Sequence, residues 1–322
     1  MAVFTPVDRE SAQSIATRLG LGRLRALEPV AAGIENTNYF LTTDEGEWVL
    51  TLFERIDGTA LDFCLRLMRH LAARDLPVPG PRADGQGVFR HRIAGKAAAL
   101  VPRLPGAHVL APDLHHCAQL GAVLARMHRA VADFAPTQPN PRGLGWCEST
   151  APRVAAFLAP PQAELLADEL DFQRRIAQSA ACSALPRGAV HTDLFRDNVL
   201  FDGLTGHERL TGCLDFFFAG VDSFAYDLAV CVNDWCLDDD EARLDEARTQ
   251  ALLGGYQHER PLAPNEARLL PALLRAAALR FWLSRLADLH LPRAAELLAP
   301  KDPLHFERLL RRHRDEPLHP DR

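Results

Sequence analysis

One eleven-residue string constrains the fold of this chain more than any other feature. It runs from His191 to Phe201 and has the form H-x-D-x-x-x-x-N followed by an apolar segment. Asp193 and Asn198 stand five positions apart, so a loop anchored by the following strand can direct both side chains into one cleft. Seventeen residues after Asn198, Asp215 stands at the end of a second apolar segment. We therefore expect these three side chains to share one site.

These residue types suit the transfer of a phosphoryl group to a hydroxyl. That reaction needs a carboxylate that orients the attacking alcohol and accepts its proton, and oxygen ligands that hold Mg²⁺ on the phosphates. Asp193 is the candidate for the first role. Asn198 is the candidate for the second, together with Asp215, which has the position of the aspartate in a D-F-G motif. His191 is expected to fix the loop. The alternative interpretation is an ordinary β-hairpin with polar loop residues.

The composition is that of a globular protein. Hydrophobic residues make up 48% of the 322 residues, and this length predicts two domains or one two-lobed unit. The formal net charge of −6 argues against a nucleic-acid partner. There is no run of about 18 apolar residues, so no membrane span is expected, and Asp8, Arg9 and Glu10 interrupt the place where an export signal needs an apolar core. Seven scattered cysteines without a C-x-x-C pair favour reduced thiols, so the cytoplasm is the expected location.

The first third of the chain shows short β-type segments with turn residues between them. Alternating apolar positions predict strands, and a period near 3.6 predicts a helix. The expected elements are strands at Leu24–Ala31, Asn38–Thr43 and Glu47–Phe53, a hairpin turn at Asp44–Gly46, a helix at Leu61–Arg74, and a second hairpin around Asp84–Gly87 that leads to Ala98–Leu104.

After about residue 110 the chain is mainly helical, and Pro102, Pro105 and Gly106 mark the change. Helices are expected at His115–Val131, Gln162–Ala181, Tyr226–Cys236, Glu241–Tyr256 and Asn265–Leu289, with β-type segments at Ala189–Phe201 and Leu210–Phe216. The acidic run 238–241 is expected to start the fourth of these helices. The prediction is an α+β, bilobal fold. Residues 1–104 would form a small lobe with an antiparallel sheet and one main helix, 101–106 the hinge, and 105–322 a larger, mostly helical lobe.

Further strings resemble those of a known superfamily. Gly220-Val221-Asp222 and Tyr226-Asp227-Leu228-Ala229, together with Asp193, Asn198 and Asp215, resemble the aminoglycoside phosphotransferase and choline kinase superfamily, which are small-molecule kinases with a protein-kinase-like fold. Four longer strings are similar to those of the homoserine kinases of that superfamily: Gly33–Leu41, Val49–Glu54, Val232–Cys236 and Arg280–Leu286. The similarity runs from about residue 3 to about residue 312.

The resemblance implies ATP and Mg²⁺ as cofactors, L-homoserine as the acceptor, and a place in threonine biosynthesis. Asp193 would be the catalytic base that faces the homoserine hydroxyl, and Asn198 and Asp215 would bind Mg²⁺. Asp227 would brace the loop from the helix that follows. The nucleotide would be held by a loop over its phosphates, at Gly33, Asn36, Thr37 and Asn38, and by a hinge that pairs with adenine, at Val101 and Arg103.

The chain departs from the wider superfamily at one phosphate contact. Thr51 stands where many members of the superfamily have a lysine. The homoserine-kinase branch is similar to this chain at that position. The only lysines of the chain, Lys96 and Lys301, lie outside that strand. Lys96 or Arg55 could replace the missing lysine. Neither G-x-G-x-x-G nor G-x-x-x-x-G-K-[ST] occurs, so a Walker-type fold is not supported.

Homoserine carries an α-ammonium and an α-carboxylate, so its pocket needs a carboxylate and an arginine that can grip in a bidentate way. Asp234 is the candidate carboxylate, and Arg280 or Arg285 is the candidate arginine. The alternative for each is an ion pair buried within the large lobe. Trp235 and Trp282 could wall the pocket, but core packing is the expected role for both.

Two other functions stay open on the sequence alone. A sibling kinase that acts on choline, an aminoglycoside, a sugar or methylthioribose would have the same fold, although Arg280 and Arg285 favour an amino acid. A catalytically silent nucleotide-binding protein is suggested by the missing lysine. It is disfavoured because Asp193, Asn198 and Asp215 are all present. The oligomeric state stays open.

Overall fold

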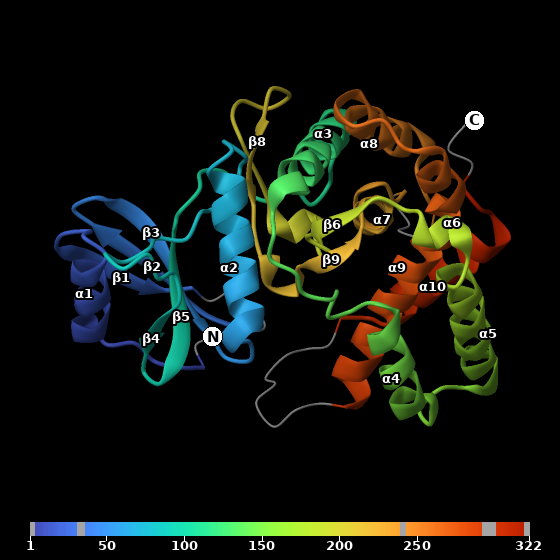
Figure 1. Ribbon diagram of the computed structural model, residues 1–322, viewed down its shortest axis with the longest axis horizontal. Coiled ribbons are helices and arrows are strands. Elements are labelled where there is room, and N and C mark those ends of the chain that lie inside the picture. The colour runs from blue at the N-terminus through green and yellow to red at the C-terminus, as the bar shows by residue number, and fades with distance from the viewer. Residues whose placement is uncertain (1–3, 31–35, 239–242, 292–300, 319–322) are drawn as a thin grey trace.

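The computed structural model describes residues 4–30, 36–238, 243–291 and 301–318. Figure 1 shows a small lobe built around a β-sheet on the left, helix α2 beside it, and a larger, mostly helical lobe on the right. The predicted α+β, protein-kinase-like architecture is confirmed. The small lobe contains α1 (Arg9–Arg18), β1 (Leu24–Pro29), β2 (Asn36–Thr43), β3 (Gly46–Phe53), α2 (Gly58–Ala72), β4 (His91–Ile93) and β5 (Lys96–Pro102).

The small-lobe sheet is antiparallel, with the strand order β1-β2-β3-β5-β4. The predicted β2–β3 hairpin is confirmed, with Thr43 paired to Gly46. Successive side chains of a strand point to opposite faces. Leu50 and Leu52 of β3 pack with α1, whereas Phe53 packs with α2 and with the large lobe. The sheet therefore has an α1 face and an α2 face, and the α2 face is turned toward the large lobe.

The second hairpin was predicted at the wrong place. β4 and β5 turn at Ala94 and Gly95, whose φ angles are +49° and +77°, and Ile93 pairs with Lys96. A two-residue hairpin turn of this kind needs positive φ at both central residues, and an alanine in the sequence gives no sign of that. The expected turn Asp84–Gly87 exists, but it closes on itself through a bond from the Gly87 N–H to the Asp84 carbonyl (2.9 Å).

The large lobe follows. Its elements are α3 (Leu114–Ala130), η1 (Val131–Asp133), α4 (Leu144–Ala155), α5 (Pro160–Ala177), α6 (Ala180–Ser183), β6 (Arg187–Val190), η2 (Arg196–Asn198), β7 (Val199–Asp202), β8 (Arg209–Cys213), η3 (Phe216–Phe218), β9 (Gly220–Ser223), α7 (Phe224–Trp235), α8 (Glu246–Glu259), α9 (Pro264–His290) and α10 (Leu304–Asp315). Two small antiparallel ribbons, β6–β9 and β7–β8, lie among the helices.

Some predicted helix boundaries are wrong because capping side chains were missed. Ser179 accepts a hydrogen bond from the Cys182 N–H (3.2 Å), and this cap separates α5 from α6. Asp245 accepts one from the Arg248 N–H (2.7 Å), so α8 begins at Glu246 and the acidic run does not start it. Residues 239–241 of that run lie outside the described residues. Helices α1, α4 and α10 were not predicted.

Helices α3 and α8 approach each other backbone to backbone. An ideal Cβ on Gly121 of α3 would lie 2.0 Å from the Leu252 carbonyl oxygen, and one on Gly255 of α8 would lie 2.1 Å from that of Ala118. Real Cβ atoms do not come so close, so both positions require glycine. Gly254, next along α8, has nothing within 4 Å of its Cβ position.

Substitution of these two neighbouring glycines by alanine is expected to have opposite effects on stability. Gly255→Ala will lower the free energy of unfolding by about 3 kcal/mol, because two packed helices must separate. Gly254→Ala will raise it by about 0.5–1 kcal/mol, because alanine loses less backbone entropy in a helix. Urea denaturation of both variants measures this difference. Equal effects at the two positions would contradict the close helix contact.

The two lobes share part of one hydrophobic core. Phe53 of β3 meets Phe217 of η3 edge to face, with ring centroids 4.6 Å apart. Trp235 and Trp282 are fully buried in the large lobe, which confirms the core interpretation of both. No helix within the described ranges is long and apolar enough to cross a membrane.

Candidate functional site

His191 anchors the loop 191–198, which joins β6 to β7. The imidazole is buried, and its Nδ1 accepts a hydrogen bond from the Asp193 N–H (3.2 Å). The ring proton is therefore on Nε2, which donates to the Leu214 carbonyl (2.7 Å). Burial lowers the pKa of His191, so the ring keeps this neutral form. His191 thus ties the loop to the end of β8, just before Asp215.

The loop backbone is held in a strained conformation by Asp227 of α7. Thr192 has φ +66°, which is unfavourable for a β-branched residue. The fully buried Asp227 carboxylate accepts hydrogen bonds from the Thr192 N–H (2.6 Å), the His191 N–H (3.0 Å) and His128 Nε2 (3.0 Å). The Thr192 hydroxyl donates to the Phe218 carbonyl (3.0 Å). These bonds hold the turn that directs Asp193.

Asn198 and Arg280 contact Asp193. Nδ2 of Asn198 donates to the Asp193 carbonyl (2.8 Å), and this leaves the amide oxygen of Asn198 to face a ligand. Nη1 of Arg280, a buried side chain of α9, lies 3.2 Å from Oδ1 of Asp193. A carboxylate fixed in this way is oriented before any substrate arrives.

Asp215 lies beside Asn198. The Leu214 N–H donates to the Asn198 carbonyl (2.8 Å), and the chain then turns at Asp215, which has φ +57°. Burial, reinforced by the negative charge of Asp215, raises the pKa of the Cys64 thiol of α2 to about 12. Asp215 therefore lies where β8, the 191–198 loop and α2 meet.

Asn198 and Asp215 fit a magnesium ion that arrives with phosphates. Mg²⁺ takes oxygen ligands and usually binds one or two protein groups together with waters and phosphate oxygens. The free amide oxygen of Asn198 and the carboxylate of Asp215 are such groups. Within the part of the chain that the structure describes, no three His, Cys, Asp or Glu side chains are arranged to hold a metal ion. The pair therefore suits a nucleotide-borne metal rather than one held by the protein alone.

Asn38 and Thr51 form a polar pair on the α2 face of the sheet. They are opposite each other in the β2–β3 register, and the Thr51 hydroxyl donates to Oδ1 of Asn38 (2.8 Å). Asn36 shares this face, and its Oδ1 accepts from the Glu54 N–H (3.4 Å). Gly33 lies outside the described residues.

Thr37 and Lys96 belong to the opposite, α1 face. The Thr37 hydroxyl donates to Oε1 of Glu54 (2.9 Å), and Nζ of Lys96 lies 2.8 Å from Oε2 of the same carboxylate. The strand alternation thus separates Lys96 from Thr51. Arg55, the other residue suggested as a replacement, lies in a bend just beyond β3, so the strand pattern does not define its direction.

Helix α2 also lacks the acid that would pair with such a lysine. The residues it turns toward the large lobe are apolar and include Leu61, Cys64 and Met68. Its single acid, Asp62, bonds Nε of Arg90 (2.8 Å). Helix α2 therefore offers no unengaged acid for a lysine at position 51, which is consistent with the threonine found there.

The segment that joins the lobes is fixed by short contacts. Val101 pairs with Val49 in the sheet, and the Arg103 guanidinium stacks over the Phe40 ring at 4.1 Å. Gly106 has φ +110°, and a Cβ there would lie 2.5 Å from the Phe201 carbonyl oxygen. The predicted hinge is therefore held against β7.

Asp234 and Arg285 each have another partner in the structure. Asp234 accepts a hydrogen bond from the Arg196 N–H (2.7 Å) and pairs with its Nε (3.3 Å), which is the ion-pair alternative. Arg285 donates to the Asp302 carbonyl (2.8 Å) and stacks over a ring of α10. Five helical positions correspond to a rotation of about 140°, so Arg280 and Arg285 cannot share one face of α9.

Sequence reasoning missed two arginines. Arg196 lies inside the motif, where its position next to Asp197 gave no sign of a bond to Asp234. Arg142 precedes the unpredicted helix α4, and its guanidinium stacks over Trp146 (4.4 Å) and Phe218 (5.2 Å). No local pattern marks it, because Phe218 is distant in sequence.

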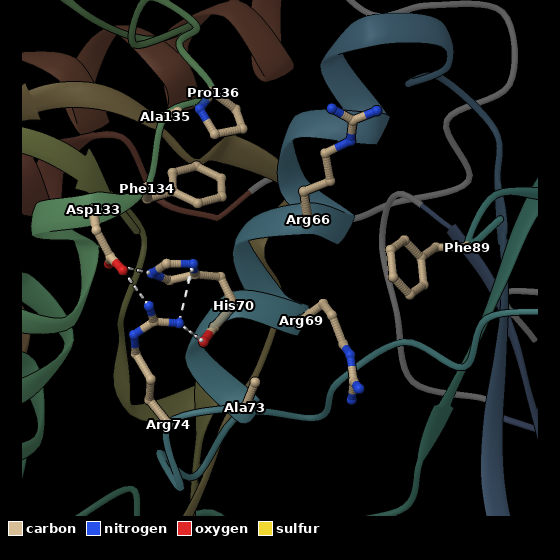
Figure 2. A pocket seen from close by; sticks show the side chains of 10 residues that line it. All are labelled: Arg66, Arg69, His70, Ala73, Arg74, Phe89, Asp133, Phe134, Ala135 and Pro136. Atoms are coloured by element: carbon tan, nitrogen blue, oxygen red, sulfur yellow. Dashed lines mark hydrogen bonds and ion pairs between the residues drawn. The ribbon is translucent and has the colours of Figure 1, made fainter. Parts of the chain in front are cut away.

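A separate hollow lies between α2, Phe89 and the segment 133–136 (Figure 2). Its lining includes Arg66, Arg69 and His70 of α2 and Arg74, just beyond that helix. Asp133 lies 3.4 Å from His70 and 2.5 Å from Arg74. None of its described lining residues belongs to the 191–198 loop, so it is distinct from the candidate site.

The fold and the site together define a small-molecule kinase of protein-kinase-like architecture. A family model described as phosphotransferase enzyme family matches residues 26–264. Homoserine kinases from Polaromonas naphthalenivorans (strain CJ2) and Janthinobacterium sp. (strain Marseille) are 52% and 49% identical to the chain. These alignments cover 97% of this chain and 97% and 95% of the two relatives. The chain belongs to the phosphotransferase enzyme family and, within it, to the family of these homoserine kinases.

Solved structures show the same fold. Amicoumacin kinase, in complex with AMP-PNP and Ca²⁺, has a TM-score of 0.71 and 18% identity, over 96% of this chain and 94% of that one. Spectinomycin phosphotransferase, in complex with ADP and spectinomycin, has a TM-score of 0.66 and 11% identity, over 95% and 94%. Identities this low support the architecture only.

Proposed function

We propose that the protein transfers the γ-phosphoryl group of ATP to the side-chain hydroxyl of L-homoserine. The product is O-phospho-L-homoserine, a precursor of threonine, and the proposed location is the cytoplasm. The observation that carries the proposal is the Asp193–Arg280 contact at 3.2 Å. It places an arginine beside the reacting carboxylate, which suits an acceptor that has both a hydroxyl and a carboxylate. The homoserine kinases of about half identity support the same acceptor.

Asp193 is the proposed base. Its carboxylate orients the acceptor hydroxyl and accepts the proton as the oxygen attacks phosphorus. The protein contributes mainly position, because phosphoryl transfer asks for little covalent chemistry from the enzyme. Arg280 and Asn198 hold Asp193, and His191 and Asp227 hold the loop that carries it.

Asn198 and Asp215 are the proposed ligands of Mg²⁺. When bound with ATP, the ion neutralises charge on the phosphates. The two side chains approach the nucleotide from the large lobe. Asn38 and Thr51 present the polar pair on the α2 face of the small lobe, and Gly33, Asn36 and Thr37 belong to the segment proposed to cover the phosphates. Val101 and Arg103 are the proposed adenine-side contacts.

Release of ADP with different acceptors tests this function. The purified chain is given ATP, Mg²⁺ and, separately, L-homoserine, choline, kanamycin, methylthioribose or N-acetylglucosamine. Turnover that depends on homoserine alone is the expected result. Turnover with another acceptor instead would retain the kinase and reject the substrate. ATP binding without turnover of any acceptor would favour the silent-kinase interpretation.

A further inference from the structure

A cavity of about 120 Å³ lies in the large lobe next to the contact between Arg280 and Asp193. Arg280 lines it from α9, Arg142 from the start of α4, and Tyr226 from α7. One water needs roughly a tenth of this volume, so the cavity can accept a charged group together with its neighbouring atoms.

The lining of the cavity is cationic. Among its described lining residues are three arginines, Arg142, Arg187 and Arg280, and a single acid, Asp222. Asp222 is already bound by Arg187 (3.3 Å) and by Nδ2 of Asn140 (2.8 Å). The described lining therefore carries more positive than negative charge, and an anionic group is the ligand that the site favours.

Arg280 has an unused hydrogen-bonding edge. Its Nη1 contacts Asp193, whereas its Nε is buried and has no partner within the described residues. A buried donor without an acceptor is costly, and Nε and Nη2 together form the edge that grips a carboxylate in a bidentate way. A carboxylate bound at this edge would be separated from Asp193 only by the guanidinium of Arg280.

Arg142 lies near the same place. Its guanidinium is 5.2 Å from the Phe218 ring, and that of Arg280 is 5.4 Å from the same ring. Aromatic faces hold a guanidinium plane and leave its edges for hydrogen bonds. Burial raises the pKa of Tyr226, so the hydroxyl of this third lining residue stays protonated.

We propose that this cavity receives the α-carboxylate of the acceptor and that Arg142, with Arg280, determines specificity for a carboxylate-bearing alcohol. The inference rests on the proposed function and adds to it the residues that read the amino-acid end. Asp193 faces the hydroxyl of the acceptor. Arg280 contacts Asp193 with one edge of its guanidinium and faces the α-carboxylate with the other. Arg142 is proposed neither as the base nor as a metal ligand, so its role can be tested apart from the chemical step.

Arg142→Leu separates substrate recognition from chemistry. We expect KM for L-homoserine to rise by roughly 10- to 100-fold, the effect of losing a hydrogen-bonded charge, with kcat and KM for ATP nearly unchanged. Arg142→Lys keeps the charge but loses the bidentate grip, so its effect will be intermediate. Arg153→Leu, at an exposed site near the end of α4, is the matched control and will leave KM unchanged.

The acceptor 3-aminopropan-1-ol, which is homoserine without its carboxylate, supplies a second readout. The wild type will strongly prefer homoserine, and Arg142→Leu will reduce this preference in kcat/KM without making the smaller acceptor worse. An equal loss on both acceptors, or an unchanged KM for homoserine in a folded variant, would overturn the assignment while the proposed function stands. A wild type that does not phosphorylate homoserine would overturn both.

Discussion

Replacing Asp193 with asparagine will lower kcat by about a thousandfold, while the dissociation constant of ATP stays nearly unchanged. Asparagine keeps the shape of the side chain and can still meet Arg280, but it cannot accept the proton of the acceptor hydroxyl. Steady-state kinetics at saturating homoserine, with ATP binding measured by calorimetry, separate the two quantities.

Asp197→Asn is the matched control for this variant. Asp197 belongs to the same loop, is half exposed and pairs with Lys301 (3.1 Å), away from Asp193. Its replacement removes the same charge and should change kcat by less than about threefold. Comparable losses in the two variants, or near-normal turnover in Asp193→Asn, would show that Asp193 is not the base.

Asp227→Asn will have the second large effect, on stability and turnover together. Burial alone would raise the pKa of Asp227, but hydrogen bonds from His128 and the Thr192 N–H outweigh it and lower the pKa. The site therefore favours the charged form. Asparagine cannot accept all three hydrogen bonds, so the free energy of unfolding at pH 7 will fall by about 3–5 kcal/mol. The freed Thr192 turn will lower kcat more than it raises KM for ATP.

Asp234→Asn is the internal comparison, since both carboxylates lie on α7 and hold opposite ends of the 191–198 loop. Burial raises the pKa of Asp234 despite the neighbouring Arg196, so a neutral side chain is tolerated better there. Urea unfolding should show a clearly smaller loss for Asp234→Asn than for Asp227→Asn. The reverse order would mean that Asp227 does not hold the strained turn.

The cluster of Asp193, Asn198 and Asp215 could be predicted because these residues are close in sequence. Asp193 and Asn198 share one short loop, and Asp215 follows just beyond β8, the partner strand of β7 in the same ribbon. A motif in the local sequence is enough to bring these three side chains together. The contact of Arg280 with Asp193 joins residues 87 positions apart, so only the packing of α9 against the loop creates it.

Errors arose where a side chain's direction depends on register. Lys96 was a reasonable substitute for the missing lysine until the β3–β5 pairing placed it on the α1 face with Glu54. Asp234 and Arg285 have the right chemistry for an amino acid, but helix rotation turns them toward Arg196 and α10. The residue types were informative, and their faces could not be known without the tertiary structure.

Identification of the product is the decisive test of homoserine phosphorylation. The full chain is incubated with ATP, Mg²⁺ and L-homoserine, and the products are analysed by phosphorus NMR and mass spectrometry. We expect one phosphomonoester on the side-chain hydroxyl, equal in amount to the ADP formed and absent with Asp193→Asn. ADP that appears with free phosphate alone, or a phosphoryl group on any other atom of homoserine, would contradict this expectation.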